Sequence, residues 1–299
     1  MINKIREFAD NSKTIRLARE NVEDMPLAKE VAMFIILFAL MILIQSIVGM
    51  ILIFPISDYN SPLYLIGVFL SFISIPVIIY VYLEKIEKRD FRSIGLCREN
   101  IITSTLMGLT IGFLMFSIVV VIGVLLGQFT FNGFDLSSVI YLIPFLLAFA
   151  IQSFGEEIYT RGWTLTSFSR RHGIITAMLI NSIVFVMPHL TNNGIDVISI
   201  VNLFLFGIFF AVMLLRFDNL WICGGAHTAW NFSQGLIYGF NVSGIDTPSL
   251  FKFSQVGENI INGGVFGPES SLIATVVVIL SIIIVVYYKN NCMCAYFND

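Results

Sequence analysis

The sequence of 299 residues has few charged side chains: Asp, Glu, Lys and Arg together make up 12% of it. Soluble domains carry about 25% charged residues, so a soluble chain of this composition would lack the polar surface that it needs. Intrinsic disorder is excluded as well, because disordered chains are poor in apolar residues and 57% of this chain is hydrophobic. The composition therefore predicts an all-α protein that crosses a membrane several times.

Other residue types are too sparse or too scattered to define a class. The four cysteines show no spacing typical of a disulfide framework or a zinc ribbon. With 22 glycines and 8 prolines, the chain is neither collagen-like nor of low complexity. A formal net charge of −3 gives no reason to expect binding to nucleic acid. The lipid bilayer is the partner that the composition implies.

Eight apolar runs approach the ~20 residues that a spanning helix needs. We therefore predict a polytopic bundle of about eight spans, at residues 31–54, 63–83, 101–126, 139–155, 174–190, 197–215, 220–240 and 272–288. No internal repeat is visible. We predict a cytoplasmic amphipathic segment at 1–30, one membrane domain at 31–290 and a cytoplasmic tail at 291–299.

The basic residues give an independent test of this topology. If the chain alternates sides across eight spans, 16 of the 17 Lys and Arg residues fall on one side, and only Lys252 falls on the other. Cytoplasmic loops carry an excess of Lys and Arg. Both termini are therefore expected in the cytoplasm, and residues 241–271 are expected on the external side.

A few ionisable residues interrupt the apolar runs. Glu156, Glu157 and Arg161 end the fourth run, His189 ends the fifth, and His227 lies inside the seventh. An ionised side chain at the bilayer centre costs ~3 kcal/mol or more. Such residues are therefore candidates for a functional site.

Helical spacing suggests different roles for these residues. Glu157 and Arg161 are four residues apart on one face, so they form either a charge-paired lock within the helix or part of a site. Glu156 points about 100° away and is a candidate general base. His227 and Asn231 share a face and could donate together to an oxyanion. Each of the two alone could equally form an interhelical hydrogen bond.

The fourth and fifth runs are expected to form a hairpin that turns at residues 172–173. Glu156 and His189 are each 16 residues from this turn, so an antiparallel hairpin places them at one depth. The polar stretch 191–196 would then lie at membrane depth, which is tolerable beside a water-filled cavity. We therefore predict an internal polar cavity lined by these side chains.

Three short motifs occur in a fixed order on these runs. The sequence resembles the CPBP family, which contains CAAX proteases and bacteriocin-processing enzymes and was formerly called the Abi family. The family pattern is Glu-Glu-x-x-x-Arg, then Phe-x-x-x-His, then His-x-x-x-Asn or Asp. It is matched by Glu156, Glu157, Arg161, Phe185, His189, His227 and Asn231. The resemblance covers about residues 95–240.

The resemblance implies an intramembrane endopeptidase that hydrolyses a peptide bond with an activated water, as in the type II CAAX prenyl endopeptidases. Glu156 would be the general base with His189 as its partner, and His227 and Asn231 would be oxyanion donors. Glu157, Arg161 and Phe185 would support them. The substrate would be a membrane-associated peptide or protein, which could be lipidated or membrane-inserted.

Metal dependence stays open in the sequence. Glu156, His189 and His227 could supply the three ligands of a catalytic zinc or another divalent ion with one position open for water. The chain lacks His-Glu-x-x-His, however, and the ligands would have to converge from three helices. We prefer a reaction that needs no cofactor, and keep zinc as the alternative.

Two other classes of function compete with the peptidase. A non-enzymatic immunity or scaffold protein could keep the fold, but it would not need Glu156, His189, His227 and Asn231 together. A proton-coupled transporter could use buried carboxylates and histidines, but it predicts inverted repeats, which the sequence does not show.

Overall fold

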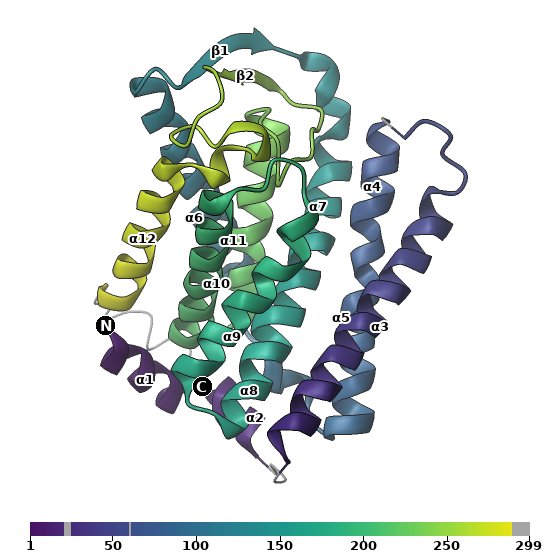
Figure 1. Cartoon of the computed structure of the whole chain (residues 1–299), viewed down its shortest axis with the longest axis vertical. Coiled ribbons are helices and arrows are strands. Elements are labelled where there is room, and N and C mark those ends of the chain that lie inside the picture. The colour runs from purple at the N-terminus through teal and green to yellow at the C-terminus, as the bar shows by residue number, and fades with distance from the viewer. Residues whose placement is uncertain (21–24, 60, 289–299) are drawn as a thin grey trace.

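The computed structural model describes residues 1–20, 25–59 and 61–288, so the tail expected at 291–299 lies outside the described residues. Figure 1 shows a bundle of roughly aligned helices with a two-stranded sheet across one end. The all-α class and the polytopic bundle are thereby confirmed.

The helices follow the predicted apolar runs. The bundle consists of α3 (Leu27–Ile53), α4 (Pro62–Leu70), α5 (Ser74–Tyr82), α6 (Ile101–Leu125), α7 (Leu142–Glu157), α8 (Thr166–Arg171), α9 (Ile174–Val186), α10 (Val197–Phe217), α11 (Leu220–Phe232) and α12 (Leu272–Tyr287). The predicted hairpin turn at 172–173 is confirmed, because α8 ends at Arg171 and α9 begins at Ile174.

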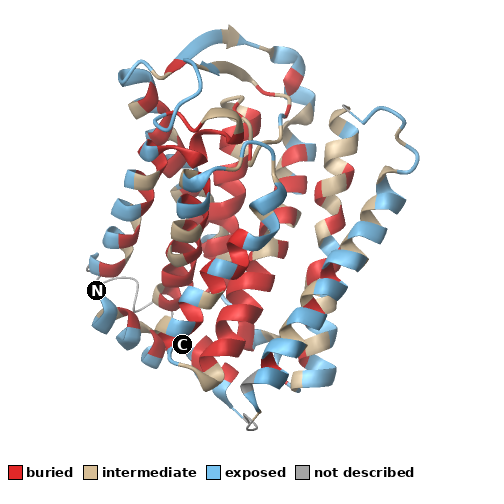
Figure 2. Ribbon diagram, viewed as in Figure 1, coloured by how far each residue is buried: buried red, intermediate tan, exposed pale blue. Residues whose placement is uncertain are grey.

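In the part of the chain that the structure describes, six helical segments are long and apolar enough to cross a membrane, at Ala28–Ile53, Pro62–Glu87, Ile101–Leu125, Leu136–Arg171, Ile174–Thr191 and Val197–Phe217. The other two predicted runs are shorter helices, α11 and α12. Apolar side chains cover the outside of the bundle: in Figure 2 most of α3 is exposed, and Ile36 and Ile51 are 66% and 68% exposed. Apolar surface on this scale fits contact with lipid. The chain is an integral, multi-pass membrane protein.

Helices α6 and α11 pack closely because small residues lie between them. A Cβ atom on Gly112 would overlap the carbonyl oxygen of Ala226, and one on Gly108 would overlap that of Ile222. Small residues of this kind let helix backbones approach in a membrane. The contact holds α11, the helix that carries His227 and Asn231, inside the bundle.

The N-terminal segment forms two short helices. Helix α1 (Ile2–Asn11) and helix α2 (Lys13–Arg19) are separated at Ser12, whose side chain caps α2 by accepting from the Ile15 amide. Ser12 and the amide of Thr14 also donate to Asp218, between α10 and α11. The segment is therefore fixed to one end of the bundle, beside the α8–α9 turn (Figure 1).

Residues 241–271 form a cap over the opposite end. Strand β2 (Phe251–Gln255) pairs antiparallel with β1 (Phe129–Phe134), which follows α6. Within the cap, the Gly244 amide donates to the Phe266 carbonyl, and Asn241 donates to the Val265 carbonyl. Lys252, the one basic residue predicted on this side, lies on β2 and pairs with Asp135. Among the described residues, the N-terminal helices, the 84–100 connection and the α8–α9 turn hold most of the basic residues, whereas Lys252 lies in the cap at the other end.

Candidate active site

A cavity of about 700 Å³ lies inside the bundle. Side chains from α3, α4 and α5 and the turn between α4 and α5 form a mostly apolar wall, and α7, α9, α10, α11 and the cap form the rest. The polar residues that line it include Gln152, Glu156, His189, Asn192, His227, Asn231, Ser243 and Glu269. The internal polar cavity predicted from the sequence is present.

The adjacent residues Glu156 and Glu157 at the end of α7 have different environments. The side chain of Glu156 lines the cavity and is 16% exposed, whereas that of Glu157 has no exposed surface. From Ile158 to Leu165 the helix widens into a π-helical stretch, η5, a form that occurs often at functional sites. Arg161 in this stretch donates to Glu157 Oε1 over 3.0 Å, so the predicted i,i+4 pair is present.

Arg161 is completely buried and is held from several sides. Its guanidinium also donates to the Thr160 hydroxyl and the Phe206 carbonyl. The rings of Phe185 and Phe210 lie 4.3 and 5.1 Å from its Cζ atom, at cation–π distance. Phe185 thus contacts the arginine as well as carrying the histidine motif.

His227 links the two glutamates. Its Nδ1 atom lies 2.9 Å from Glu157 Oε1, and its Nε2 atom lies 3.8 Å from Glu156 Oε2. Glu157 is therefore shared between Arg161 and His227 in a buried row of groups. The contact also shows that α11 reaches the depth of the α7 carboxylates.

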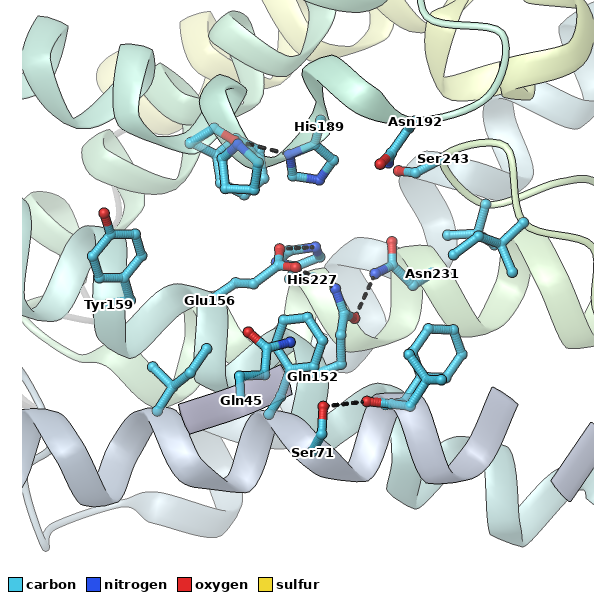
Figure 3. A pocket seen from close by; sticks show the side chains of 18 of the residues that line it. Gln45, Ser71, Gln152, Glu156, Tyr159, His189, Asn192, His227, Asn231 and Ser243 are labelled. Carbon is cyan, nitrogen blue, oxygen red and sulfur yellow. Dashed lines mark hydrogen bonds and ion pairs between the residues drawn. The ribbon is translucent and has the colours of Figure 1, made fainter. Parts of the chain in front are cut away.

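Gln152, one turn before Glu156 on α7, is a site residue that sequence reasoning missed. It donates to Glu156 Oε1 over 2.6 Å, and its carbonyl oxygen accepts from Asn231 Nδ2 over 3.1 Å. Its position at i−4 from a candidate base was the available signal, since such residues share a helix face. The Asn231 amide is thus bonded to Gln152 and turned toward the same cavity as His227 (Figure 3).

His189 lies across the cavity from Glu156 and His227 (Figure 3). The α-helix gives way before Pro188 to a 3₁₀ turn, η6 (Met187–Thr191), and the His189 Nδ1 atom lies 2.9 Å from the Phe185 carbonyl. The other ring nitrogen, Nε2, is not used in this contact and can interact with a molecule in the cavity. Thr191 and Asn192 also line the cavity, as expected for the polar stretch 191–196.

The cap contributes a carboxylate that sequence reasoning also missed. Glu269 lines the cavity, is 6% exposed, and accepts from the amide and hydroxyl of Ser243. Burial raises the pKa of this carboxyl above its usual value, although the Ser243 hydrogen bonds act in the opposite direction. Nothing in the sequence around Glu269 distinguished it, since it lies outside the apolar runs.

The candidate metal ligands Glu156, His189 and His227 line one cavity but are not gathered around a single point. Across residues 1–20, 25–59 and 61–288, no three His, Cys, Asp or Glu side chains come together in an arrangement that could hold an ion. Of the candidate ligands, Glu156 and His227 are in contact, whereas His189 lies on the facing side. We therefore assign no catalytic step to a metal, and metal dependence stays a prediction for experiment.

Residues 137–233 match a family model, Rce1-like, described as type II CAAX prenyl endopeptidase Rce1-like. The match spans 97 of the 299 residues and contains all three motifs, from Glu156 to Asn231. It confirms the resemblance to the CPBP and CAAX protease family, over a shorter range than the predicted 95–240. No curated protein and no solved structure gives a significant match. The family and the helical bundle together support the fold of a CAAX-type intramembrane protease and suggest a peptidase.

Proposed function

We propose that the chain is an intramembrane endopeptidase that hydrolyses a peptide bond in a membrane-associated peptide or protein. The observation that carries the proposal is that Glu156, His189, His227 and Asn231 line one cavity inside an apolar bundle. The match to the Rce1-like model over residues 137–233, a range that contains all four positions, supports it.

In this proposal a water molecule lies between the facing side chains of Glu156 and His189. Glu156 takes a proton from the water, and the oxygen attacks the substrate carbonyl carbon. The same proton then passes to the leaving nitrogen as the carbon–nitrogen bond breaks, which balances the reaction. Gln152 fixes the Glu156 carboxylate through the hydrogen bond to Oε1, so the second oxygen is left to act as base.

His227 and Asn231 would stabilise the oxyanion that forms during attack. An ionised carboxylate only accepts hydrogen bonds, so a charged Glu157 requires a proton on His227 Nδ1. His227 can then donate from Nε2 only as an imidazolium. Arg161, Glu157, His227 and Glu156 would form a row of alternating charge, in which each carboxylate is compensated. Asn231 would exchange its bond to Gln152 for one to the oxyanion.

We also propose that both termini face the cytoplasm. The N-terminal helices, the 84–100 connection and the α8–α9 turn lie at one end of the bundle and hold most of the basic residues, which are favoured on the cytoplasmic side. The cap, with Lys252, would then be external. Prenylated CAAX proteins, bacteriocin or signal-peptide precursors and other membrane polypeptides are the substrate classes that follow from the family resemblance.

The proposal is tested by comparing membrane peptidomes from cells that produce the wild-type, Glu156→Ala or His189→Ala protein. Loss of a general base or its partner is expected to slow cleavage by at least ~100-fold. A precursor should therefore accumulate with either variant, and its cleavage products should disappear. The accumulated precursor would identify the substrate and the cleaved bond.

His172→Ala is the matched control. His172 lies at the α8–α9 turn, outside the cavity, and its replacement should leave processing unchanged. Melting temperatures in detergent should show that all three variants are folded. Normal processing by both Glu156→Ala and His189→Ala would refute the catalytic assignment, and would favour a non-enzymatic role for the same fold.

A further inference from the structure

Glu269 differs from the other buried carboxylates in its lack of a basic partner. Three acidic side chains are buried in the described part of the chain: Glu30, Glu157 and Glu269. Glu30 pairs with Arg171 at 3.3 Å, and Glu157 pairs with Arg161 at 3.0 Å. Glu269 has no Lys, Arg or His within 4.0 Å among the residues described, and the amide and hydroxyl of Ser243, which donate to it, are neutral groups. A buried carboxylate without a cation is unfavourable, so a reason for its position is needed.

The backbone holds Glu269 in place independently of its charge. Asn202 on α10 donates from Nδ2 to the carbonyl oxygens of Glu269 and Ser271, over 2.8 and 2.9 Å. The Ser243 amide and hydroxyl bind the same carboxylate oxygen, Oε1, over 2.6 and 2.8 Å. The carboxylate is therefore fixed at the cavity wall by neutral groups, which orient it without cancelling its charge.

A protonated His227 would attract the Glu269 carboxylate, but it does not lie within the 4.0 Å of an ion pair among the described residues. No Lys or Arg is among the described residues that line it, and Arg161 is buried behind the wall. In the proposed mechanism His227 is in contact with Glu156 and Glu157, so it compensates Glu269 only from a distance, and a cation that enters the cavity could pair with Glu269 directly.

We infer that Glu269, oriented by Ser243, forms a subsite for a positively charged group of the peptide substrate, such as a Lys or Arg side chain or an amino-terminal ammonium. The inference rests on the proposed function and specifies its substrate class: polypeptides with a basic group near the cleaved bond. A carboxylate at the same place would be repelled by Glu269. The position of Ser243 and Asn192 beside the catalytic residues puts this subsite within the same cavity (Figure 3).

Binding can be measured without cleavage in the Glu156→Ala protein reconstituted in nanodiscs. The probes are three fluorescein-labelled 20-residue Leu/Ala peptides that carry Lys, Gln or Glu at the central position. Fluorescence anisotropy should give the order Lys, Gln, Glu from tightest to weakest, with Lys at least about 10-fold tighter than Gln, the scale of one charged hydrogen bond. Adding Glu269→Gln should bring the Lys-to-Gln ratio close to one.

Glu258→Gln is the matched control, because Glu258 lies in the same cap but is exposed and does not line the cavity. It should leave the ratio unchanged. A ratio near one in the Glu156→Ala protein, or a ratio that survives Glu269→Gln, would overturn the inference. If Glu269→Gln does not fold, the order of the three peptides in the Glu156→Ala protein decides. A third outcome separates the two proposals. If the peptides bind in the expected order but the wild-type protein cleaves nothing in cells, the peptidase proposal is refuted and the cation subsite is retained.

Discussion

Replacement of Arg161 by Met is expected to destabilise the fold strongly. The Glu157–Arg161 pair has no exposed side-chain surface on either partner and an N–O distance of 3.0 Å. Arg161→Met keeps much of the side-chain volume but leaves the Glu157 carboxylate with His227 as its remaining charged partner. Removal of one member of a buried ion pair costs about 3–5 kcal/mol. The loss should appear in unfolding by increasing SDS in mixed micelles, followed by tryptophan fluorescence.

The double variant Glu157→Gln/Arg161→Met separates stability from function. Without either charge, no uncompensated carboxylate is left, so the double variant should recover about 2 kcal/mol relative to Arg161→Met. Precursor cleavage should not recover, because His227 loses the carboxylate that holds its Nδ1 atom. If stability and cleavage recover together, the pair does not orient His227.

Arg92→Met is the control for this experiment. Arg92 pairs with Asp90 at 2.8 Å, but both side chains are about half exposed or more, at 62% and 48%. Exposed pairs contribute little to stability, so the unfolding midpoint should not move. The reasoning on burial fails if Arg161→Met costs less than about 1 kcal/mol, or if the double variant loses the sum of both single losses.

Two further predictions concern helix packing and metal. Gly112→Leu should separate α6 from α11 and destabilise the fold by about 1–3 kcal/mol or more, measured in the same SDS titration. Thr110→Leu is the control, because Thr110 lies on an exposed face of α6 and its replacement should have little effect. Cleavage of the accumulated precursor in vitro should be unchanged by EDTA or phenanthroline, since we assign no step to an ion, and a loss of activity that zinc restores would overturn the metal-free mechanism.

Hydropathy predicted the bundle because burial in lipid fixes both the length and the composition of a spanning segment. The start of α9 and the turn at 172–173 could be placed from the sequence for this reason. The pairing of β1 with β2 could not, since its partners are about 120 residues apart and local periodicity carries no record of contacts between distant segments. The break between α1 and α2 depends likewise on Asp218, far along the chain.

In the site, too, contacts between distant segments could not be predicted from the sequence. Motif order and helix faces identified Glu156, His189, His227 and Asn231 as cavity residues, and all four line the cavity. The i,i+4 rule also predicted the Glu157–Arg161 pair. The contact of His227 with Glu157 could not be predicted, because it depends on how deeply α11 enters the bundle, which close packing at Gly108 and Gly112 decides.

An ionisable residue is easy to recognise as functional in the apolar runs of this chain and hard to recognise in the cap. Within the apolar runs, each ionisable residue stands out against the cost of burial, so Glu156, Glu157 and Arg161 could be recognised directly. In the cap, a carboxylate is unremarkable until folding carries it into the cavity, as happens to Glu269. The residues expected to perform the chemistry are therefore visible in the sequence. The residue expected to select the substrate becomes visible only when the cap is in place, because its burial comes from tertiary structure and not from the span that contains it.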